Sequence, residues 1–246
     1  MSITAKRPEE SPSPSGHEAR WEQHNLERQT RILEAAVAMI EEGPAGADIP
    51  VQQIAKRAGL AKSVVYRQFD GREDLDCRIR SHLIDEFSRT LDAQLDISTG
   101  SVEEILVRTI RAVADWMTDH PRLNEFARTG PIAPEADIDA VSSLKARMSV
   151  RARELISSIA TQIDVDDSAF DSVPLAVVTM VEGTLTQWVS DPTPARDREE
   201  IVADLARFAW FVLDGAARSA GVTVDPKADL VSVIAQLSGA GGDVAV

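Results

Sequence analysis

The chain has 246 residues, of which 43% are hydrophobic and 27% charged, and its formal net charge is −14 at pH 7. This composition is typical of an ordinary soluble protein and excludes a chain that is disordered throughout. No apolar run approaches the roughly 20 residues that a membrane-spanning helix needs, since the most apolar stretch, residues 175–181, is followed by Glu182. We therefore expect a cytoplasmic protein without a membrane partner.

The first segment, residues 1–24, is rich in Pro, Ser and Glu and has no apolar core, so we expect a disordered leader rather than a secretory signal. After it, apolar residues recur with helical spacing along the whole chain, and no segment alternates as a strand does. The first helix is predicted over residues 26–42 and ends at Gly43-Pro44. The fold class is all-α.

Two short helices follow, over residues 50–58 and 62–69, separated by a turn that contains Gly59. Pro50 stands at the start of the first short helix, where a missing N–H costs nothing. A longer helix opens at Asp70, which is predicted to cap it with Glu73 three residues later. This helix is long enough to link the small N-terminal bundle to the rest of the chain.

Most of the remaining chain is also predicted to be helical. A capping box, Ser101 with Glu104, opens a helix that runs to about residue 119. Further helices are expected over residues 121–129, after Pro134, over 172–190, over 198–219 and over 227–237, before a flexible tail, 239–246. The expected domains are thus residues 25–86, a helix-turn-helix bundle, and residues 87–238, a larger helical domain.

No local motif for a metal or another cofactor is present in the sequence. The four histidines are not spaced four residues apart and have no neighbouring cysteine. Cys77 is the only cysteine, which excludes a disulfide within the chain, and its helical surroundings favour a structural thiol over a nucleophile. We expect neither a metal nor a cofactor.

Basic charge is concentrated in residues 51–72, although the chain as a whole is acidic. This segment holds five cationic residues and one carboxylate, so the acidic charge lies in the rest of the chain. DNA binding depends on neutralising phosphates with Lys and Arg. An acidic remainder would repel DNA from every other face and so orient the protein.

The same segment has the plan of a helix-turn-helix, in which the second helix lies in the major groove. Val65 and Phe69 are spaced to face a core, together with Ile54 of the preceding helix. The opposite face of the second helix carries side chains that donate hydrogen bonds to phosphates or base edges. These are Lys62, Ser63, Tyr66 and Arg67.

In these residues the chain resembles the TetR family of bacterial transcriptional regulators. The resemblance lies in Arg31-Ile32-Leu33-Glu34-Ala35-Ala36, Ile54-Ala55, Ala58-Gly59-Leu60, Lys62, Tyr66, Arg67, Phe69 and Glu73-Asp74-Leu75. The chain departs from the family pattern at two positions. Pro50 stands where the family usually has Thr or Ser, and Ala61 stands where it usually has Ser. Both departures remove a hydroxyl that would cap a helix.

The resemblance implies a role for each matching position. Tyr66 and Arg72 would bind phosphates and Gln52 would reach the DNA backbone, whereas Lys62, Ser63, Val64 and Arg67 would approach base edges. The remaining chain would form an effector-binding and dimerising domain. Large or pliable apolar side chains are the predicted pocket lining: Trp116, Met117, Phe126, Met148, Phe170, Met180 and Trp188. The last two long helices resemble the dimerisation pair of the family, with Val177, Val181, Leu205, Phe208 and Val212 at the interface.

The predicted function is therefore a DNA-binding transcriptional regulator rather than an enzyme. The resemblance favours a homodimeric repressor that binds a near-palindromic operator and is released by a small hydrophobic or amphipathic effector, while activation remains an alternative. Two other classes stay open. A helical enzyme lacks support because no phosphate loop or nucleophile motif is present. An adaptor that uses its helix-turn-helix for protein contacts would bind DNA with almost no salt dependence.

Overall fold

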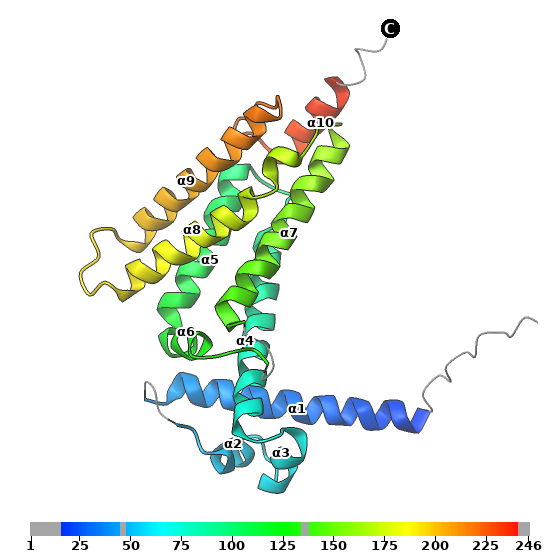
Figure 1. Ribbon diagram of the computed structural model, residues 1–246, viewed down its shortest axis with the longest axis vertical. Helices are drawn as coiled ribbons and strands as arrows, with labels where there is room; N and C mark the ends of the chain where they lie inside the picture. The colour runs from blue at the N-terminus through cyan, green and yellow to red at the C-terminus, as the bar shows by residue number, and fades with distance from the viewer. Residues whose placement is uncertain (1–15, 45–47, 134–137, 241–246) are drawn as a thin grey trace, which may run out of the picture.

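The computed structural model describes residues 16–44, 48–133 and 138–240, and in these ranges the regular secondary structure is helical (Figure 1). The helices are α1 (Gly16–Glu42), α2 (Val51–Arg57), α3 (Lys62–Gln68), α4 (Arg72–Gln94), α5 (Val102–Asp119), α6 (Pro121–Arg128), α7 (Ala140–Gln162), α8 (Val173–Ser190), α9 (Arg198–Ser219) and α10 (Leu230–Ala240), with a 3-10 turn, η1 (Ser168–Phe170). The predicted all-α class is confirmed. Within the same ranges no helix is long and apolar enough to cross a membrane.

Helices α1, α2 and α3 form a small bundle around the first part of α4 (Figure 1). Its core contains Ile32 and Ala36 of α1, Ile54 of α2, Val65 of α3 and Leu75 of α4, each at most 1% exposed. Helices α2 and α3 have only seven residues each. Helices this short are unstable alone, so the shared core holds them in place.

Helix α1 begins at Gly16, well before the predicted start at Leu26. The predicted disordered leader is therefore wrong for residues 16–24, and its residues 1–15 lie outside the described ranges. This part of α1 has no apolar stripe, since Trp21 and Leu26 are both exposed. Directly after this segment, Gln68 of α3 donates from Nε2 to Oδ1 of Asn25 at 2.5 Å.

Helix α4 is preceded by Gly71, whose φ of 97° lies in the region that favours glycine. The predicted cap by the Asp70 side chain is wrong, because the backbone N–H of Asp70 instead donates to Oδ2 of Asp74 at 3.0 Å. Cys77 is buried one turn further along, and this burial raises the pKa of its thiol. That environment agrees with a structural cysteine.

Helix α4 is shared by two parts of the molecule. Near its start, Leu75 and Leu83 belong to the core of the N-terminal bundle. Further along, Phe87 and Leu91 pack with Met148 of α7 in a separate cluster. The change from one core to the other falls between Leu83 and Phe87. Figure 1 shows α4 running from the small bundle up into the larger one.

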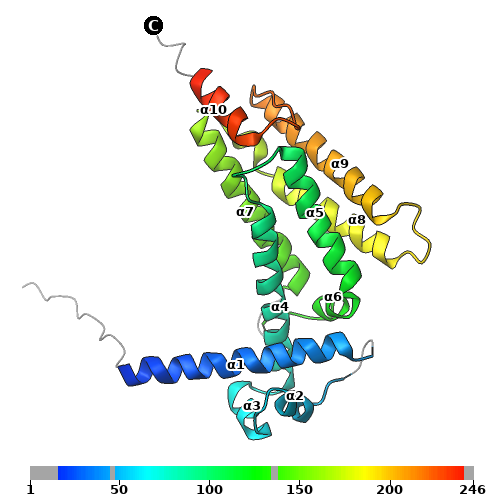
Figure 2. The ribbon, with the colours of Figure 1, turned by 180° about the vertical axis from the view of Figure 1, so that it is seen from behind.

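The larger bundle contains α5 to α10 and the second half of α4. Its main core is formed by Ile110 and Ala114 of α5, Leu185 of α8, and Leu205 and Ala209 of α9, all of them buried. Helices α8 and α9 form a hairpin along one outer edge of this bundle (Figures 1 and 2). The two helices pack against each other and on α5.

Two capping boxes fix the starts of α5 and α9. The predicted one is confirmed: Glu104 N donates to Ser101 Oγ at 3.2 Å, and Ser101 N donates to Glu104 Oε2 at 2.8 Å. The second joins Asp197 and Glu200 in the same way. Each box satisfies two N–H groups that the first turn of a helix leaves without partners.

The end of the chain differs slightly from the prediction. Helix α10 spans Leu230–Ala240 instead of residues 227–237, and Ser232 N at its start donates to Asp229 Oδ1 at 2.9 Å. Residues 239 and 240 are helical, whereas residues 241–246 of the predicted tail lie outside the described ranges. This short helix closes the end of the bundle opposite α2 and α3 (Figure 1).

A substitution of Leu75 tests the core that holds α2 and α3 in place. Leu75→Ala should lower the free energy of unfolding by about 2–5 kcal/mol, because it removes buried methyl groups and leaves a cavity. Leu26→Ala is the matched control, since Leu26 is exposed on α1 and its loss should cost less than about 0.5 kcal/mol. Urea denaturation measures both. Equal effects would contradict this description of the core.

Candidate DNA-binding surface and ligand cavity

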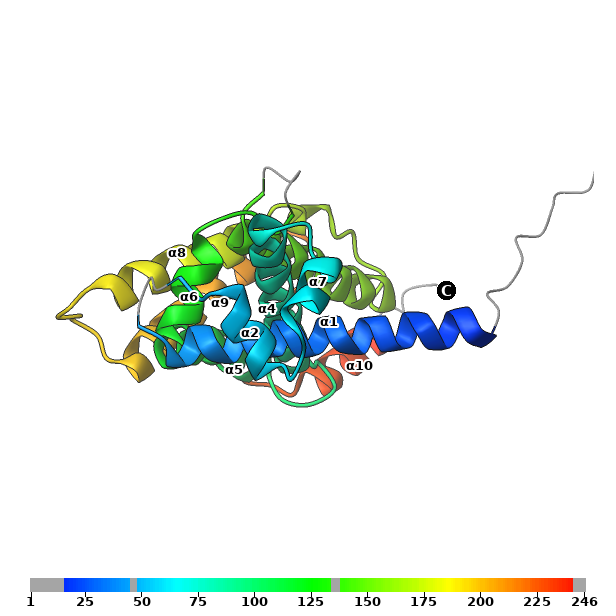
Figure 3. The same ribbon diagram turned by 90° about the horizontal axis from the view of Figure 1, so that it is seen from below.

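Helix α3 presents a polar face on the outside of the small bundle. Val65 and the adjoining Phe69 are buried, which fixes the rotation of the helix. The opposite side is therefore turned to solvent and carries four of the predicted contact residues. These are Lys62, Ser63, Tyr66 and Arg67, all exposed. Seen from this end of the molecule, α2 and α3 lie in front of α1 (Figure 3).

The polar face has some internal order. The ammonium of Lys62 lies over the ring of Tyr66, 5.4 Å from its centroid, which holds both side chains on the outer surface. Val64 is half-buried beside them, and Gln52 is exposed on α2. Six of the seven predicted DNA contacts thus lie on α2 and α3, with Arg72 placed differently.

Arg72 is bound by the protein itself. Its Nε donates to both carboxylate oxygens of Asp76 at 2.8 and 2.9 Å, and its Nη1 donates to the carbonyl of Ile49 at 2.5 Å. Asp48 completes the set at 2.9 Å. Arg72 therefore ties the segment before α2 to the start of α4. The side chain remains partly exposed, so a phosphate contact would share a guanidinium that already has partners.

The turn between α2 and α3 depends on Gly59, whose φ is 67°. Arg31 of α1 supports this turn by donating from Nη2 to the carbonyl of Ala58 at 2.5 Å. Neither Pro50 nor Ala61, which precede α2 and α3, makes a side-chain cap, as the sequence predicted. The orientation of α3 therefore rests on its core contacts and on this arginine.

A second arginine joins α2 to α1. Arg57 binds Glu42 through two hydrogen bonds, and these hold the pKa of the Glu42 carboxyl below its ordinary value. Both residues are at the surface, so the pair contributes little stability. The pair instead lowers the positive charge that residues 51–72 can offer to a phosphate, because the charge of Arg57 is already offset by Glu42.

The larger bundle contains a cavity of about 340 Å³ whose wall is almost wholly aliphatic. Helices α4, α5, α7, α8, α9 and α10 all contribute to its wall. Its volume and apolar character fit the range of natural small-molecule sites. The lining includes Leu91, Leu95, Ile105, Leu106, Val113, Leu144, Met148, Ile156, Ile159, Phe170, Val177, Val178, Leu213, Val233 and Ile234.

Two of the seven predicted pocket residues, Met148 and Phe170, line this cavity. The other five do not, and each is packed elsewhere. Met117 is in the main core and Met180 packs against it, while Trp188 donates from Nε1 to the carbonyl of Arg196 in the hairpin at 2.8 Å. Side-chain size was therefore a poor guide, because most of the lining consists of Leu, Ile and Val.

The remaining two predicted pocket residues hold the domains together. Trp116 stacks on Phe87 with ring centroids 4.6 Å apart and also touches the four apolar clusters that the described residues form. Phe126 lies under the guanidinium of Arg80, which also donates to the carbonyls of Phe126 and Pro131. Both aromatic residues therefore pack at the junction of the two domains.

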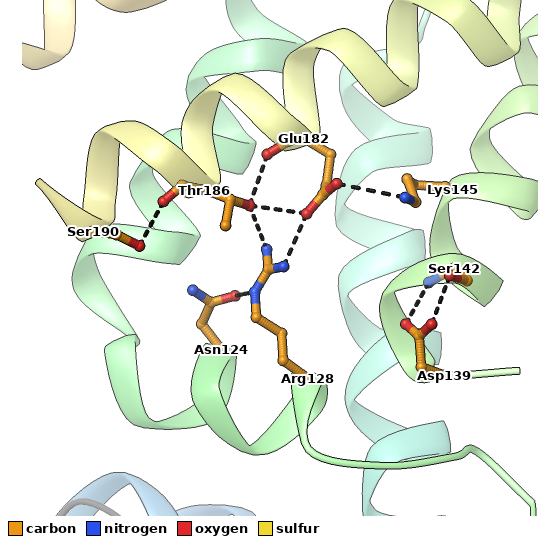
Figure 4. Close-up of polar contacts among 8 residues, drawn as sticks. All are labelled: Asn124, Arg128, Asp139, Ser142, Lys145, Glu182, Thr186 and Ser190. Atoms are coloured by element: carbon orange, nitrogen blue, oxygen red, sulfur yellow. Dashed lines mark hydrogen bonds and ion pairs between the residues drawn. The ribbon is translucent and has the colours of Figure 1, made fainter.

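Two charged residues, Lys145 and Glu182, interrupt the apolar lining. Figure 4 shows Glu182 between Lys145 and Arg128, whose nitrogens lie 3.5 and 2.9 Å from its carboxylate oxygens. Burial raises the pKa of Glu182, but hydrogen bonds from Thr186 and Arg128 outweigh it and hold the pKa below its ordinary value. Glu182 is thus an ionised carboxylate in the cavity wall.

The sequence contained a signal for this cluster that our prediction did not use. Glu182 is the only charged residue in α8, so it requires a cationic partner if that helix packs in a bundle. One partner is Arg128 of α6, 54 positions before it in the chain, and the other is Lys145 of α7, 37 positions before it. The need for a partner was therefore predictable, whereas its identity was not.

Helix α6 and the residue before it, His120, join this cluster to the N-terminal bundle. His120 Nδ1 lies 3.0 Å from Oε1 of Glu41, and Arg122 donates from Nη1 to the carbonyl of Glu41 at 2.7 Å. Leu123 enters the core of the small bundle. The helix that carries Arg128 therefore also contacts the end of α1.

Comparisons with known proteins agree with this arrangement. Residues 32–75 match the family model described as bacterial regulatory proteins, tetR family. Two uncharacterized HTH-type transcriptional regulators, from the CDC 1551 and H37Rv strains of Mycobacterium tuberculosis, are each 24% identical over 213 residues, or 84% of this chain and 86% of each relative.

Solved structures resemble most of the fold. A tetR-family transcriptional regulator from Streptomyces coelicolor aligns with a TM-score of 0.59 and 16% identity, covering 87% of this chain and 89% of that protein. A putative transcriptional regulator from Pseudomonas aeruginosa PAO1 aligns with a TM-score of 0.50 and 15% identity, over 79% and 94% of the two chains.

The fold and the exposed face of α3 define a helix-turn-helix DNA-binding protein. The relatives with which it aligns are HTH-type transcriptional regulators. Over residues 32–75 the chain matches the tetR family, and its fold is similar to that of a tetR-family regulator.

The polar face of α3 generates a prediction about DNA. Tyr66→Phe should weaken binding to all duplexes alike, by about 0.5–1.5 kcal/mol, because it removes one hydroxyl donor to the phosphate backbone. Arg67→Ala should weaken binding and also alter sequence preference, since a guanidinium reads base edges. Fluorescence anisotropy with random and selected duplexes separates these effects. Arg89→Ala, an exposed substitution on α4, is the control, and equal loss in all three variants would contradict the assignment.

Proposed function

We propose that this protein is a ligand-controlled repressor that binds a near-palindromic operator as a homodimer and releases it when a small apolar or amphipathic effector enters the cavity. The observation that carries the proposal is the placement of α4. Its first half is part of the core that positions α3, and Leu91 in its second half lines the cavity. One helix therefore contacts both candidate sites.

An effector in the cavity would change the position of α2 and α3 through two other helices, α4 and α6. Helix α4 lines the cavity directly, and α6 contacts Glu41 of α1 through His120 and Arg122. An effector that binds one arrangement of these helices more tightly than another shifts the population toward it. Effector and operator are then antagonists, because each lowers the affinity for the other by the same factor.

The outer face of the α8–α9 hairpin supports the homodimer. Phe208, Phe211 and Val212 of α9 are 43%, 60% and 38% exposed, which is unusual for large apolar side chains on adjacent turns. A Cβ built on Gly183 of α8 or on Gly215 of α9 would meet no atom within 4 Å. A second copy of the hairpin would cover this face in a two-fold, four-helix contact.

The predicted interface residues divide into two groups. Phe208 and Val212 lie on the exposed face, and Val177 is half-buried. Val181 and Leu205 are only 7% and 1% exposed, because they face the main core of their own chain. We correct the proposed interface accordingly, replacing Val181 and Leu205 by Phe211. Helical spacing identified the apolar residues of α8 and α9 but not which side faces inward.

Selection of bound fragments from a random DNA pool tests the proposed function. A two-fold dimer that reads successive major grooves should select a near-palindrome whose half-sites lie about one helical turn apart, roughly 34–36 Å. The selected duplex then serves in titrations with candidate effectors. An asymmetric consensus would contradict binding by a two-fold dimer. A DNA affinity that hardly changes with salt concentration would instead favour an adaptor.

The dimer itself is tested by Phe211→Glu. A carboxylate at this position would have to be desolvated between two apolar faces, so the variant should be monomeric at micromolar concentration. Analytical ultracentrifugation reports the mass. Val231→Glu is the matched control, because Val231 is also exposed but lies on α10. If the Phe211 variant keeps the mass of the native protein, the interface lies elsewhere.

A further inference from the structure

The two charged lining residues lie toward one end of the cavity. Glu182 is the last residue that α8 contributes to the wall, and Lys145 is one turn from Val141, the first that α7 contributes. From Lys145 the wall continues along α7 as far as Ala160, roughly 22 Å at 1.5 Å per residue, and then to α10. The cavity is therefore elongated, with charge at the end near α6 and aliphatic side chains beyond.

The charge at this end is unbalanced. Two cations, Arg128 and Lys145, share the single carboxylate of Glu182. Asp139, the residue before α7, is exposed and accepts hydrogen bonds from N and Oγ of Ser142 (Figure 4). Those two hydrogen bonds are the main causes that lower its pKa, and the charge of Lys145 contributes least. The cluster of Arg128, Lys145 and Glu182 thus carries one more positive than negative charge.

Lys145 has the capacity to bind this missing counterion. An ammonium has three N–H donors, and the hydrogen bond recorded for Lys145 Nζ is a long one, 3.5 Å to Glu182 Oε2. Arg128 is better satisfied, since it also reaches Asn124 and Thr186 at 3.2 and 2.8 Å. An oxygen acceptor of negative charge at Lys145 would complete the cluster.

Resting on the function proposed above, we infer that the effector is an anionic amphiphile, an aliphatic carboxylic acid in its ionised form. Its carboxylate binds Lys145 Nζ, and its chain occupies the aliphatic part of the cavity toward α10. A charge-assisted hydrogen bond is about twice as strong as a neutral one, which favours an anion at the partly buried ammonium of Lys145. The chain contributes by burying apolar surface against the Leu, Ile and Val side chains.

The same geometry disfavours the other head groups. An amine would meet Arg128 and Lys145, while the carboxylate of Glu182 that it needs already has three partners. A neutral alcohol would fill the aliphatic part but leave the extra positive charge unpaired. Because Arg128 belongs to α6, a head group at Lys145 also lies beside the helix that contacts the DNA-binding bundle.

Isothermal titration calorimetry with three probes of equal chain length tests this inference: decanoate, 1-decanol and decylamine. The native protein should bind decanoate most tightly. Lys145→Met should weaken decanoate binding by about tenfold or more, the usual worth of a hydrogen bond to a charged group. It should leave the affinity for 1-decanol within about twofold, since the apolar wall is unchanged.

Two further variants make the result specific. Lys145→Arg keeps the charge and should retain the preference for decanoate. Arg151→Met removes a cation from the same helix, where Arg151 pairs with Asp92 and Glu154 at the surface, and should leave all three affinities unchanged. Tighter or equal binding of 1-decanol or decylamine, or binding of none, would overturn the inference. Equal loss of decanoate and 1-decanol in both Lys145→Met and Lys145→Gln would also overturn it.

A separate measurement distinguishes failure of the inference from failure of the proposed function. Decanoate is added to the complex of the protein with its selected duplex, and DNA affinity is measured by anisotropy. Release of DNA by decanoate, with loss of release in Lys145→Met, supports both. Tight decanoate binding with unchanged DNA affinity supports the head-group assignment and refutes ligand control of DNA binding.

Discussion

The structure depends on the continuous burial of helix α4 in two cores. Leu75 packs in the DNA-binding bundle, and Leu91 packs beside the cavity on the same unbroken helix, which contains neither glycine nor proline. A helix without these residues has no position that favours a sharp kink, so we expect it to move largely as one piece. Any change in the packing around Leu91 must therefore be met by movement at the other end or by strain.

A second connection limits which movements are available. Helix α6 contacts α1 through Glu41, and Arg80 of α4 is enclosed by the carbonyls of Phe126 and Pro131. Trp116 fills the space between them and touches every apolar cluster. The two domains thus meet through α4 and α6 together, so that a shift of either helix must carry the other or repack this tryptophan.

Much of the fold was predictable because its signals are local. Ser101 and Glu104 cap α5, and Gly59 marks the turn before α3. Features decided by distant contacts were not predictable: Glu182 finds its cationic partners on α6 and α7, far from it in the chain. The site shows the same division. The face of α3 follows from helical spacing, whereas the cavity lies where six helices fail to fill space, which no single periodicity encodes.

Fewer cations of the N-terminal bundle are available to DNA than the sequence alone indicated, because two of them form ion pairs. Arg57 faces Glu42, and Arg72 faces Asp48 and Asp76. Three cations of residues 51–72 form no ion pair among the described residues. They lie on α2 and α3 and are Lys56, Lys62 and Arg67. The basic charge available to phosphates is thus concentrated on the two reading helices. The acidic surface elsewhere would repel DNA phosphates and so disfavour other orientations of the protein on DNA. With only three such cations, charge contributes modestly to the affinity for DNA but helps to orient the protein.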